Sequence, residues 1–332
     1  MADVTVPIDE AIGLVASALQ RCRTNPQNAQ VVARALVAAE ADGLKGHGLV
    51  RVGSYAAQAK VGKVDGKATP TSSRPAPGVI VVDAAHGFAY PAIDMAIAAL
   101  PEIAQTQGIA VATIRRSHHC GAAGHPVEKL AERGLVALLF ANTPAAIAPW
   151  GGSRGLFGTN PIAFSCPNPD SPPIVVDLSL SKVPRGTLFA AKKRGETIPQ
   201  DWALDPEGRP TTDPGDALKG TMVPVGEAKG TALALMVELL AAGVVGAKFA
   251  GETSSFLEAD GPPPGTGQLI IALDPMVIGG ASTLARFGEL AAMIEAEPHA
   301  RLPGQRRIKN RAAAKADGLN VDTALIGEIK AL

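Results

Sequence analysis

The stretch that decides the fold is residues 109–140, IAVATIRRSHHCGAAGHPVEKLAERGLVALLF. Its two ends, Ile109–Ile114 and Leu135–Phe140, are short apolar runs of the kind found in buried strands. Between them, Gly124–Glu132 has the pattern of a helix, and Arg133-Gly134 is a typical helix end. A strand, loop, helix and strand within about 30 residues predict a βαβ unit and a sheet covered by helices.

On both sides of this unit the sequence continues to predict an α/β protein. We expect helices in two segments within 8–42, at 91–105, 230–240 and 287–296, and strands at 79–83, 161–165, 173–177 and 268–273. Residues 190–222 and 251–267 are rich in turn formers. These segments predict a helical domain made of residues 1–108 and 299–332, and a mixed-sheet domain made of residues 109–298. The C-terminus is expected to return and pack on the first part.

Composition limits the classes of function. The chain has 332 residues, enough for about two domains. Hydrophobic residues make up 46%, so a large core can be buried. Lys+Arg and Asp+Glu balance at 31 each, and aromatic residues make up only 4%. A basic surface or stacking platform for nucleic acid is therefore not expected.

The cysteines and the N-terminus indicate a reducing compartment. Cys22, Cys120 and Cys166 are odd in number and widely spaced, so they predict neither a disulfide framework nor a zinc motif. The first residues lack the basic and apolar regions of a signal peptide. No run approaches the ~18 apolar residues of a membrane helix. We expect a cytoplasmic protein that does not interact with membranes.

The segment Lys45-Gly46-His47-Gly48-Leu49-Val50-Arg51 is the first candidate for chemistry. If it is helical, His47 and Arg51 lie on one face, about one turn apart. An imidazole exchanges protons near neutral pH, and a guanidinium can bind a carboxylate through two hydrogen bonds. The pair suits a small acid that is reduced or oxidised at the carbon next to its carboxylate. A partly buried His beside a solvated Arg would give the same spacing.

The sequence lacks the usual nucleotide-binding motifs. Neither GxGxxG nor the P-loop occurs in the sequence. However, the loop Arg115–Gly124 joins a predicted strand to a predicted helix, and its small residues at 121–124 would let backbone N–H groups approach a phosphate. An ordinary tight turn between strand and helix fits these residues equally well.

Two other chemistries find little support. His118, His119, Cys120 and His125 lack a nearby carboxylate and a compact ligand spacing, so we expect no metal site. Ser117 and Ser165 lie outside any GxSxG elbow, which argues against a serine hydrolase. Near the C-terminus, Arg301-Leu-Pro-Gly-Gln-Arg-Arg307 brings three guanidiniums into one turn. This turn is either a solvated basic patch or a binding site for the 2′-phosphate that distinguishes NADP from NAD.

Together these segments resemble the malate/L-lactate dehydrogenase-like oxidoreductase family, over residues 10 to 325. The resemblance also rests on further motifs, namely Ala148–Gly152 with Phe157–Pro161, Val176–Ser179, Ile198-Pro199 with Pro210–Pro214, Val223-Pro224 with Lys229-Gly230, and Thr266–Gln268. Within the family the chain is most similar to the Δ1-piperideine-2-carboxylate/Δ1-pyrroline-2-carboxylate reductases. The resemblance implies a non-Rossmann sheet domain that binds NADPH, with NADH as the alternative, and a homodimer.

The resemblance also implies roles for individual residues. His47 matches the proton donor, and Arg51, Thr159, Arg185 and Gly186 match substrate contacts. The implied cofactor contacts are His119, Cys120, Gly121, Ala122, Ala123, Asp177, Leu178, Ser179, Ala228, Lys229, Arg301, Leu302, Pro303, Gly304, Gln305, Arg306 and Arg307. Two positions depart from the family: Gly46 and Thr187 stand where members have the Ser and Asp of a relay with the His. A Thr hydroxyl can orient an imidazole but adds no charge, so Thr187 is the expected catalytic support of His47.

The predicted function is NADPH-dependent reduction of a cyclic imino acid at C2, giving L-proline from Δ1-pyrroline-2-carboxylate or L-pipecolate from Δ1-piperideine-2-carboxylate. The first alternative is the same hydride chemistry on an open-chain 2-oxo acid, as in a malate/L-lactate-type 2-hydroxy acid dehydrogenase. The second is a nucleotide-binding protein without catalysis. The partner expected in the first two cases is a small imino or 2-oxo acid.

Overall fold

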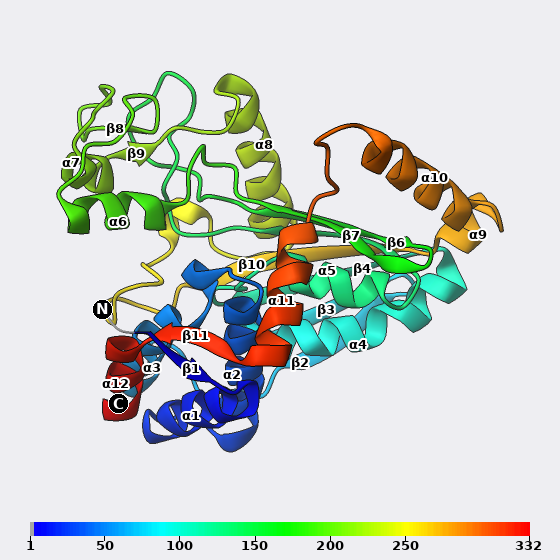
Figure 1. Ribbon diagram of the computed structural model, residues 1–332, viewed down its shortest axis with the longest axis horizontal. Coiled ribbons are helices and arrows are strands. Elements are labelled where there is room, and N and C mark those ends of the chain that lie inside the picture. The colour runs from blue at the N-terminus through cyan, green and yellow to red at the C-terminus, as the bar shows by residue number, and fades with distance from the viewer. Residues whose placement is uncertain (1–2) are drawn as a thin grey trace.

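The computed structural model describes residues 3–332 and has a seven-stranded mixed sheet at its centre (Figure 1). The strand order is β2 (Thr71–Ala76), β3 (Val79–Asp83), β4 (Ile109–Ser117), β10 (Thr266–Leu273), β5 (Val136–Ala141), β6 (Ile162–Asn168) and β7 (Ser171–Leu178). β3 and β4 are parallel, and the other neighbours are antiparallel. β4, α5 (Gly124–Ala131) and β5 form the predicted crossover, with β10 inserted between the two strands. The α/β fold class is confirmed.

Helices cover both faces of the sheet because side chains alternate along its strands. Ala110, Ala112 and Ile114 of β4 are buried under α4 (Ala89–Gln107) and α5. On the other face, Phe140 of β5 and Leu269 of β10 pack against α8 (Ala228–Glu238) and the π-helical turn 239–244 that continues it. The central strands β5 and β10 are therefore covered on both faces, as their continuous apolar runs predicted.

The N-terminal part is helical, and the C-terminus returns to it as predicted. α1 (Ile8–Arg21), α2 (Pro26–Ala41) and α3 (Val52–Val61) share one core with β11 (Leu319–Asp322) and α12 (Thr323–Ala331). β11 pairs with β1 (Asp3–Val6). Asn25 caps α2, since its side chain accepts a hydrogen bond from Asn28 N at 2.8 Å. α11 (Gln305–Asp317) runs from this part toward the sheet (Figure 1).

A small lobe lies beside the sheet, in green in Figure 1. It contains α6 (Arg185–Arg194), β8 (Ala203–Leu204), α7 (Pro214–Lys219) and β9 (Thr221–Met222). Its own core is built around Ile147, Leu188 and Met222. α9 (Pro275–Gly279) and α10 (Thr283–Ala296) form an arm at the opposite end of the molecule.

The structure differs from the sequence-based expectation in two places. The condition that residues 45–51 are helical is met only in part: two 3-10 turns, Lys45–His47 and Leu49–Arg51, which are separated at Gly48, precede α3. The reason is that the Glu40 carboxylate accepts a hydrogen bond from Leu49 N at 2.9 Å and breaks the helical path at Gly48. The sheet also takes in two strands from residues 1–108: β3, which matches the strand expected at 79–83, and β2, which was not expected.

Candidate active site

His47 ends the first 3-10 turn, and its ring stacks on that of His119. The ring centroids are 5.2 Å apart and the planes differ by 16°. Burial lowers the pKa of His47 to about 4, and the positive charge of Arg51 acts in the same direction. Its Nδ1 is buried and has no hydrogen-bond partner among residues 3–332. His47 is therefore a neutral imidazole at pH 7, and no neighbouring group fixes its tautomer.

Arg51 ends the second turn and is half-buried. Its Nε donates to the Gly46 carbonyl oxygen at 2.7 Å. Its charge also lowers the pKa of the buried His118 and His119. A free guanidinium edge beside these neutral rings is suited to hold an anion such as a carboxylate.

The turn between β4 and α5 runs through the interior next to His47. His118, His119 and Cys120 are all buried, and Gly121 has a φ of +72°. A Cβ at Gly121 would lie 2.6 Å from the Tyr90 hydroxyl, so only glycine fits there. Two predicted cofactor segments, 119–123 and 177–179, are neighbours in space. Gly124, which follows the first segment, donates from its backbone N to Asp177 Oδ2 of the second at 2.7 Å.

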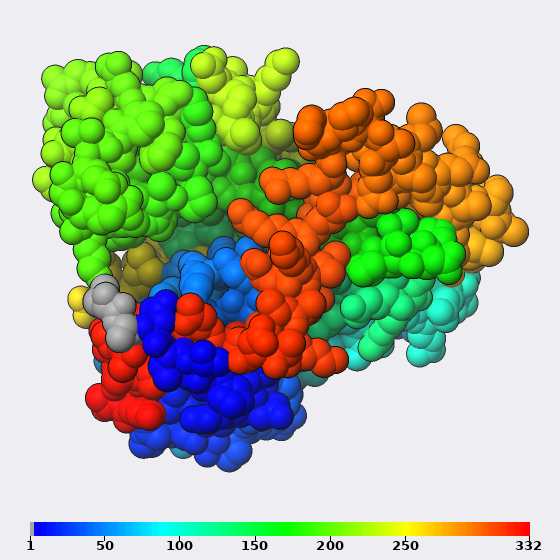
Figure 2. All heavy atoms as spheres, viewed as in Figure 1, coloured from blue at the N-terminus to red at the C-terminus, as the bar shows by residue number. Residues whose placement is uncertain are grey.

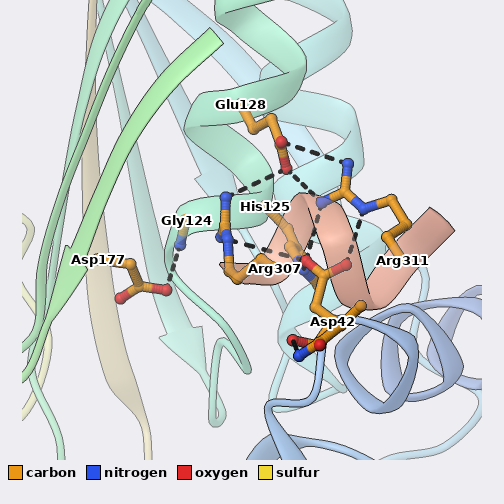
Figure 3. Close-up of polar contacts among 8 residues, drawn as sticks. Asp42, Gly124, His125, Glu128, Asp177, Arg307 and Arg311 are labelled. Carbon is orange, nitrogen blue, oxygen red and sulfur yellow. Dashed lines mark hydrogen bonds and ion pairs between the residues drawn. The ribbon is translucent and has the colours of Figure 1, made fainter. Parts of the chain in front are cut away.

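The third predicted cofactor segment, 301–307, lies beside them. Arg301 and Arg306 are exposed, whereas Arg307 is only 7% exposed. All three Arg307 guanidinium nitrogens are buried without a hydrogen bond, although NH2 lies 3.5 Å from Glu128 Oε2. Its NH1 is 2.6 Å from where a Cβ of Gly124 would stand. Figure 3 shows Arg307 between Glu128, Asp42 and the Gly124–Asp177 contact.

A set of ion pairs holds Arg307 in this position. Arg311 donates to Asp42 at 2.7 and 2.8 Å and to Glu128 at 3.2 and 2.8 Å. His125 Nε2 is 2.9 Å from Asp42 Oδ2. Burial acts to raise the pKa of Asp42, but Arg311 and His125 outweigh it and lower the pKa to about 2. The carboxylate therefore stays charged and links α2, α5 and α11 (Figure 3).

The remaining predicted residues lie on the small lobe and on α8. Thr159 is half-buried, and its Oγ1 is 3.2 Å from Thr143 Oγ1. Arg185, Gly186 and Thr187 form the first turn of α6, where Arg185 NH2 donates to the Leu218 carbonyl oxygen at 2.8 Å. No hydrogen bond joins Thr187 to Nδ1 of His47 in the described part of the chain. Ala228 and Lys229 begin α8 and line a cavity of about 940 Å³ together with residues 148–152.

Several residues that the sequence analysis did not single out complete the site. Tyr55 Oη is 2.6 Å from His119 Nδ1 and 3.2 Å from Tyr90 Oη. The Phe256 ring contacts His118 and His119, with centroids 5.0 and 5.3 Å away. The loop that carries Phe256 is held by Lys63, whose ammonium donates to three of its carbonyl oxygens at 2.7–2.9 Å. The sequence offered one signal that could have drawn attention to Tyr55 and Tyr90: the chain has only 2 Tyr.

Two other kinds of site are absent from residues 3–332. No cluster of three or more His, Cys, Asp or Glu side chains has an arrangement that could bind a metal ion. No helix there combines the length and the apolar character needed to span a membrane.

The fold and the site define an oxidoreductase built on a mixed sheet, with a buried histidine beside a glycine-containing turn between strand and helix. The family model described as malate/L-lactate dehydrogenase matches residues 6–330, and the chain belongs to this family. Its relatives are dehydrogenases and reductases, so the expected oxidoreductase class is confirmed and a protein without catalysis is not favoured.

Individual relatives differ in substrate. The chain is 47% identical to the (2R)-3-sulfolactate dehydrogenase (NADP(+)) of Chromohalobacter salexigens over 98% of this chain and 97% of the relative. It is 40% identical to the Δ1-pyrroline-2-carboxylate reductase of Ancylobacter novellus over 92% and 91%. The crystal structure of Δ1-piperideine-2-carboxylate reductase from Pseudomonas syringae pv. tomato superimposes with a TM-score of 0.94 at 37% identity, over 99% of both chains. The predicted resemblance to this branch is confirmed.

Proposed function

We propose that the chain is an NADPH-dependent reductase of cyclic imino acids that acts on Δ1-pyrroline-2-carboxylate and Δ1-piperideine-2-carboxylate at C2. The observation that carries the proposal is the stacking of His47 on His119, because it joins the proposed proton-handling residue to the proposed cofactor turn. Seven curated relatives at 35–40% identity have names of this reductase type, and these names support the imino acid.

The residues around Arg307 fit NADPH. The Arg307 guanidinium, which makes no hydrogen bond and lies 3.5 Å from Glu128 and 3.9 Å from Asp42, would bind a phosphate group beside the N-terminus of α5, and a larger residue at Gly124 would fill the space. When NADPH is bound, its nicotinamide supplies the hydride. Asp177–Ser179, Ala228, Lys229 and the turn 119–123 would hold the rest of the cofactor. The relative with 47% identity is named for NADP(+), which supports NADPH over NADH.

In this proposal Arg51 binds the substrate carboxylate, and Thr159 and Arg185 contact the rest of the molecule. His47, neutral in the free protein, takes up a proton from solvent once the substrate carboxylate has compensated the charge of Arg51, and gives this proton to the nitrogen at C2 as C2 is reduced. General acid help of this kind contributes about 10²–10⁴-fold. Thr187 stands at the position where family members have the relay Asp. We therefore propose that the Thr187 hydroxyl, rather than a carboxylate, supports His47.

A second candidate is oxidation and reduction of a doubly charged 2-hydroxy or 2-oxo acid such as 3-sulfolactate. Two observations favour it: the relative with 47% identity carries this name, and the positive charge of Arg51 lowers the pKa of His47 while no negative charge within residues 3–332 raises it. A site with Arg51, Arg185 and no carboxylate beside the imidazole would suit a dianion better than a substrate whose imine nitrogen is protonated.

One assay separates the two. NADPH oxidation is measured with Δ1-pyrroline-2-carboxylate, pyruvate and 3-sulfopyruvate, and NADP+ reduction with 3-sulfolactate. A kcat/KM for the cyclic imine at least tenfold above the others is expected. A higher value for the sulfonated acid would replace the first proposal by the second, and turnover of none would reject both.

We also propose that the chain forms a homodimer in the cytoplasm, through the outer face of α8. Leu233, Leu235, Met236 and Leu239 are 38–52% exposed there. Leu235 and Leu239 line a hollow of about 370 Å³ with Leu156, Phe157 and Phe249. Exposed apolar patches of this extent mark interaction sites, and a second copy is the partner that cyclic symmetry makes commonest. Figure 2 shows the yellow-green α8 segment uncovered at the upper edge of the molecule.

A further inference from the structure

A chain of three buried polar groups ends at His119 and is not used by the function proposed above. Tyr90 Oη lies 3.2 Å from Tyr55 Oη, which lies 2.6 Å from His119 Nδ1. Tyr55 is fully buried, Tyr90 is 8% exposed and His119 is 6% exposed. Buried polar groups at these distances must share their protons so that each donor has an acceptor.

Counting donors and acceptors decides how the protons are arranged. If His119 Nδ1 carried a proton, Tyr55 would accept it and would have to donate to Tyr90. The Tyr90 hydroxyl would then have no acceptor, because Tyr55 is its only hydrogen-bond partner in residues 3–332. In the opposite arrangement Tyr90 donates to Tyr55, Tyr55 donates to His119 Nδ1, and both hydroxyl protons are used.

The second arrangement fixes the other side of the His119 ring. Burial keeps the pKa of His119 well below its usual value, so the ring is neutral and carries one proton. With Nδ1 as acceptor, that proton is on Nε2. Nε2 has no partner in the described chain and, unlike Nδ1 of His47 and His118, is not among the atoms sealed from solvent. The donor is therefore open to a ligand next to the stacked ring of His47.

We propose that Tyr55 is a positioning residue that holds His119 as the Nε2–H tautomer, and that this N–H is a second fixed hydrogen-bond donor of the active site. The inference rests on the proposed function for its role in turnover. Its acceptor is an oxygen or nitrogen of the substrate, or the carboxamide oxygen of the nicotinamide. No described residue hydrogen-bonds to Nδ1 of His47 and fixes its tautomer. A donor with a fixed position at His119 would therefore give the site one hydrogen bond of defined direction to its ligand.

The first test needs no substrate. In the full-length protein labelled with ¹⁵N-histidine, the shifts of the two ring nitrogens report which one carries the proton, and the His119→Asn variant assigns the signals. We expect an unprotonated Nδ1 and a protonated Nε2 in the wild type and in Tyr90→Phe, and a mixture of tautomers in Tyr55→Phe. A protonated Nδ1 in the wild type would overturn the proposal. This outcome is independent of whether the imino acid is the substrate.

The second test uses turnover with the substrate that the assay above identifies. Tyr55→Phe should lower kcat about 10- to 100-fold, the usual contribution of a residue that orients a functional group from behind. Ser165→Ala is the control: it removes a fully buried hydroxyl on β6, outside the proposed site, and should change kcat less than threefold. Equal losses in both variants, or no loss in Tyr55→Phe, would contradict the proposal.

The binding of NADPH distinguishes the two acceptors. If kcat falls and Tyr55→Phe also weakens NADPH binding, measured by fluorescence titration, His119 donates to the carboxamide. If NADPH binding is unchanged and kcat falls, the acceptor belongs to the substrate. Either result supports the fixed donor, whereas unchanged NADPH binding together with unchanged kcat rejects it.

Discussion

At the scale of single residues, the site depends on an imidazole that the protein keeps neutral. His47→Ala removes this group and should lower kcat by about 10²–10⁴-fold, the contribution of a general acid. The NADPH dissociation constant should change less than threefold, because the proposed phosphate contacts lie on other elements. Steady-state kinetics and a fluorescence titration measure the two quantities. Retained turnover would remove His47 from the mechanism, and exposed His299→Ala serves as the control.

The buried histidines also predict how stability depends on pH. Burial lowers the pKa of His47 from 6.5 to about 4 and that of His118 to about 3. The unfolded chain therefore binds more protons as pH falls, and stability that is present above about pH 6.5 is lost on going toward pH 4. Each residue should cost about 2 kcal/mol between pH 7 and pH 5.

Urea unfolding at pH 7 and pH 5 measures this dependence. The difference in the free energy of unfolding between the two pH values should shrink by about 2 kcal/mol in His47→Ala. It should stay at the wild-type value in His299→Ala. Equal pH dependence in the wild type and in His47→Ala would show that His47 is not held neutral.

At the scale of elements, the break between the two 3-10 turns sets the direction of His47 and Arg51. A Cβ at Gly48 would lie 2.2 Å from Glu40 Oε2, the atom that accepts a hydrogen bond from Leu49 N. Gly48→Ala must therefore displace either the carboxylate or the turn. We expect a loss of about 1–3 kcal/mol in unfolding free energy and a fall of up to about 100-fold in kcat/KM.

Gly46→Ala is the matched control for this prediction, because nothing lies within 4 Å of the added Cβ. Its stability should stay within about 0.5 kcal/mol of the wild type. If thermal unfolding shows the same Tm shift for both variants, the close contact of Gly48 with Glu40 is not what shapes this segment.

The elements also show how far the sequence alone could go. The apolar runs of β4 and β5 and the glycine turn before α5 are local patterns, and these predictions were confirmed. The insertion of β10 between β4 and β5 was not predictable, because its partners in β5 and β4 lie 127 to 164 positions earlier in the chain, and pairing over such a separation leaves no periodic signal. β2 was missed because it is an exposed edge strand whose sequence, TSSRPA, has no apolar alternation.

The candidate site had the same limit. His47, Arg51 and the turn 119–123 could be chosen from residue type and from the resemblance, and their roles stay predictions. Tyr55 and Tyr90 could not, since their 35-residue separation hides the hydrogen bond that joins them. The break between the two 3-10 turns of His47 and Arg51 could not be predicted, because Glu40, a residue outside the segment, accepts a hydrogen bond from its backbone at Leu49 N.

At the scale of the whole molecule, the site lies where three parts of the chain meet. Asp42 ends α2 of the helical part, Glu128 lies on α5 beside the sheet, and Arg311 lies on α11. The two carboxylates are 1% and 6% exposed as side chains, so Arg311 balances charges that would be costly alone. These ion pairs hold the helical part, with its His47 and Arg51, in a fixed position against the proposed cofactor turn.

The outer surface of the whole molecule leads to the last prediction. If a second copy covers α8, then Leu239→Glu places a charge in that interface and should shift the protein from dimer to monomer. Leu239 is 52% exposed, so the change should not disturb the core of one subunit. Met293→Glu on α10 is the matched control, since Met293 is 68% exposed at the other end of the molecule and should leave the dimer intact. Sedimentation velocity over a range of protein concentrations measures the mass of each variant. A wild type that sediments as a monomer, or a Leu239→Glu variant that remains a dimer, would show that α8 is not the interface.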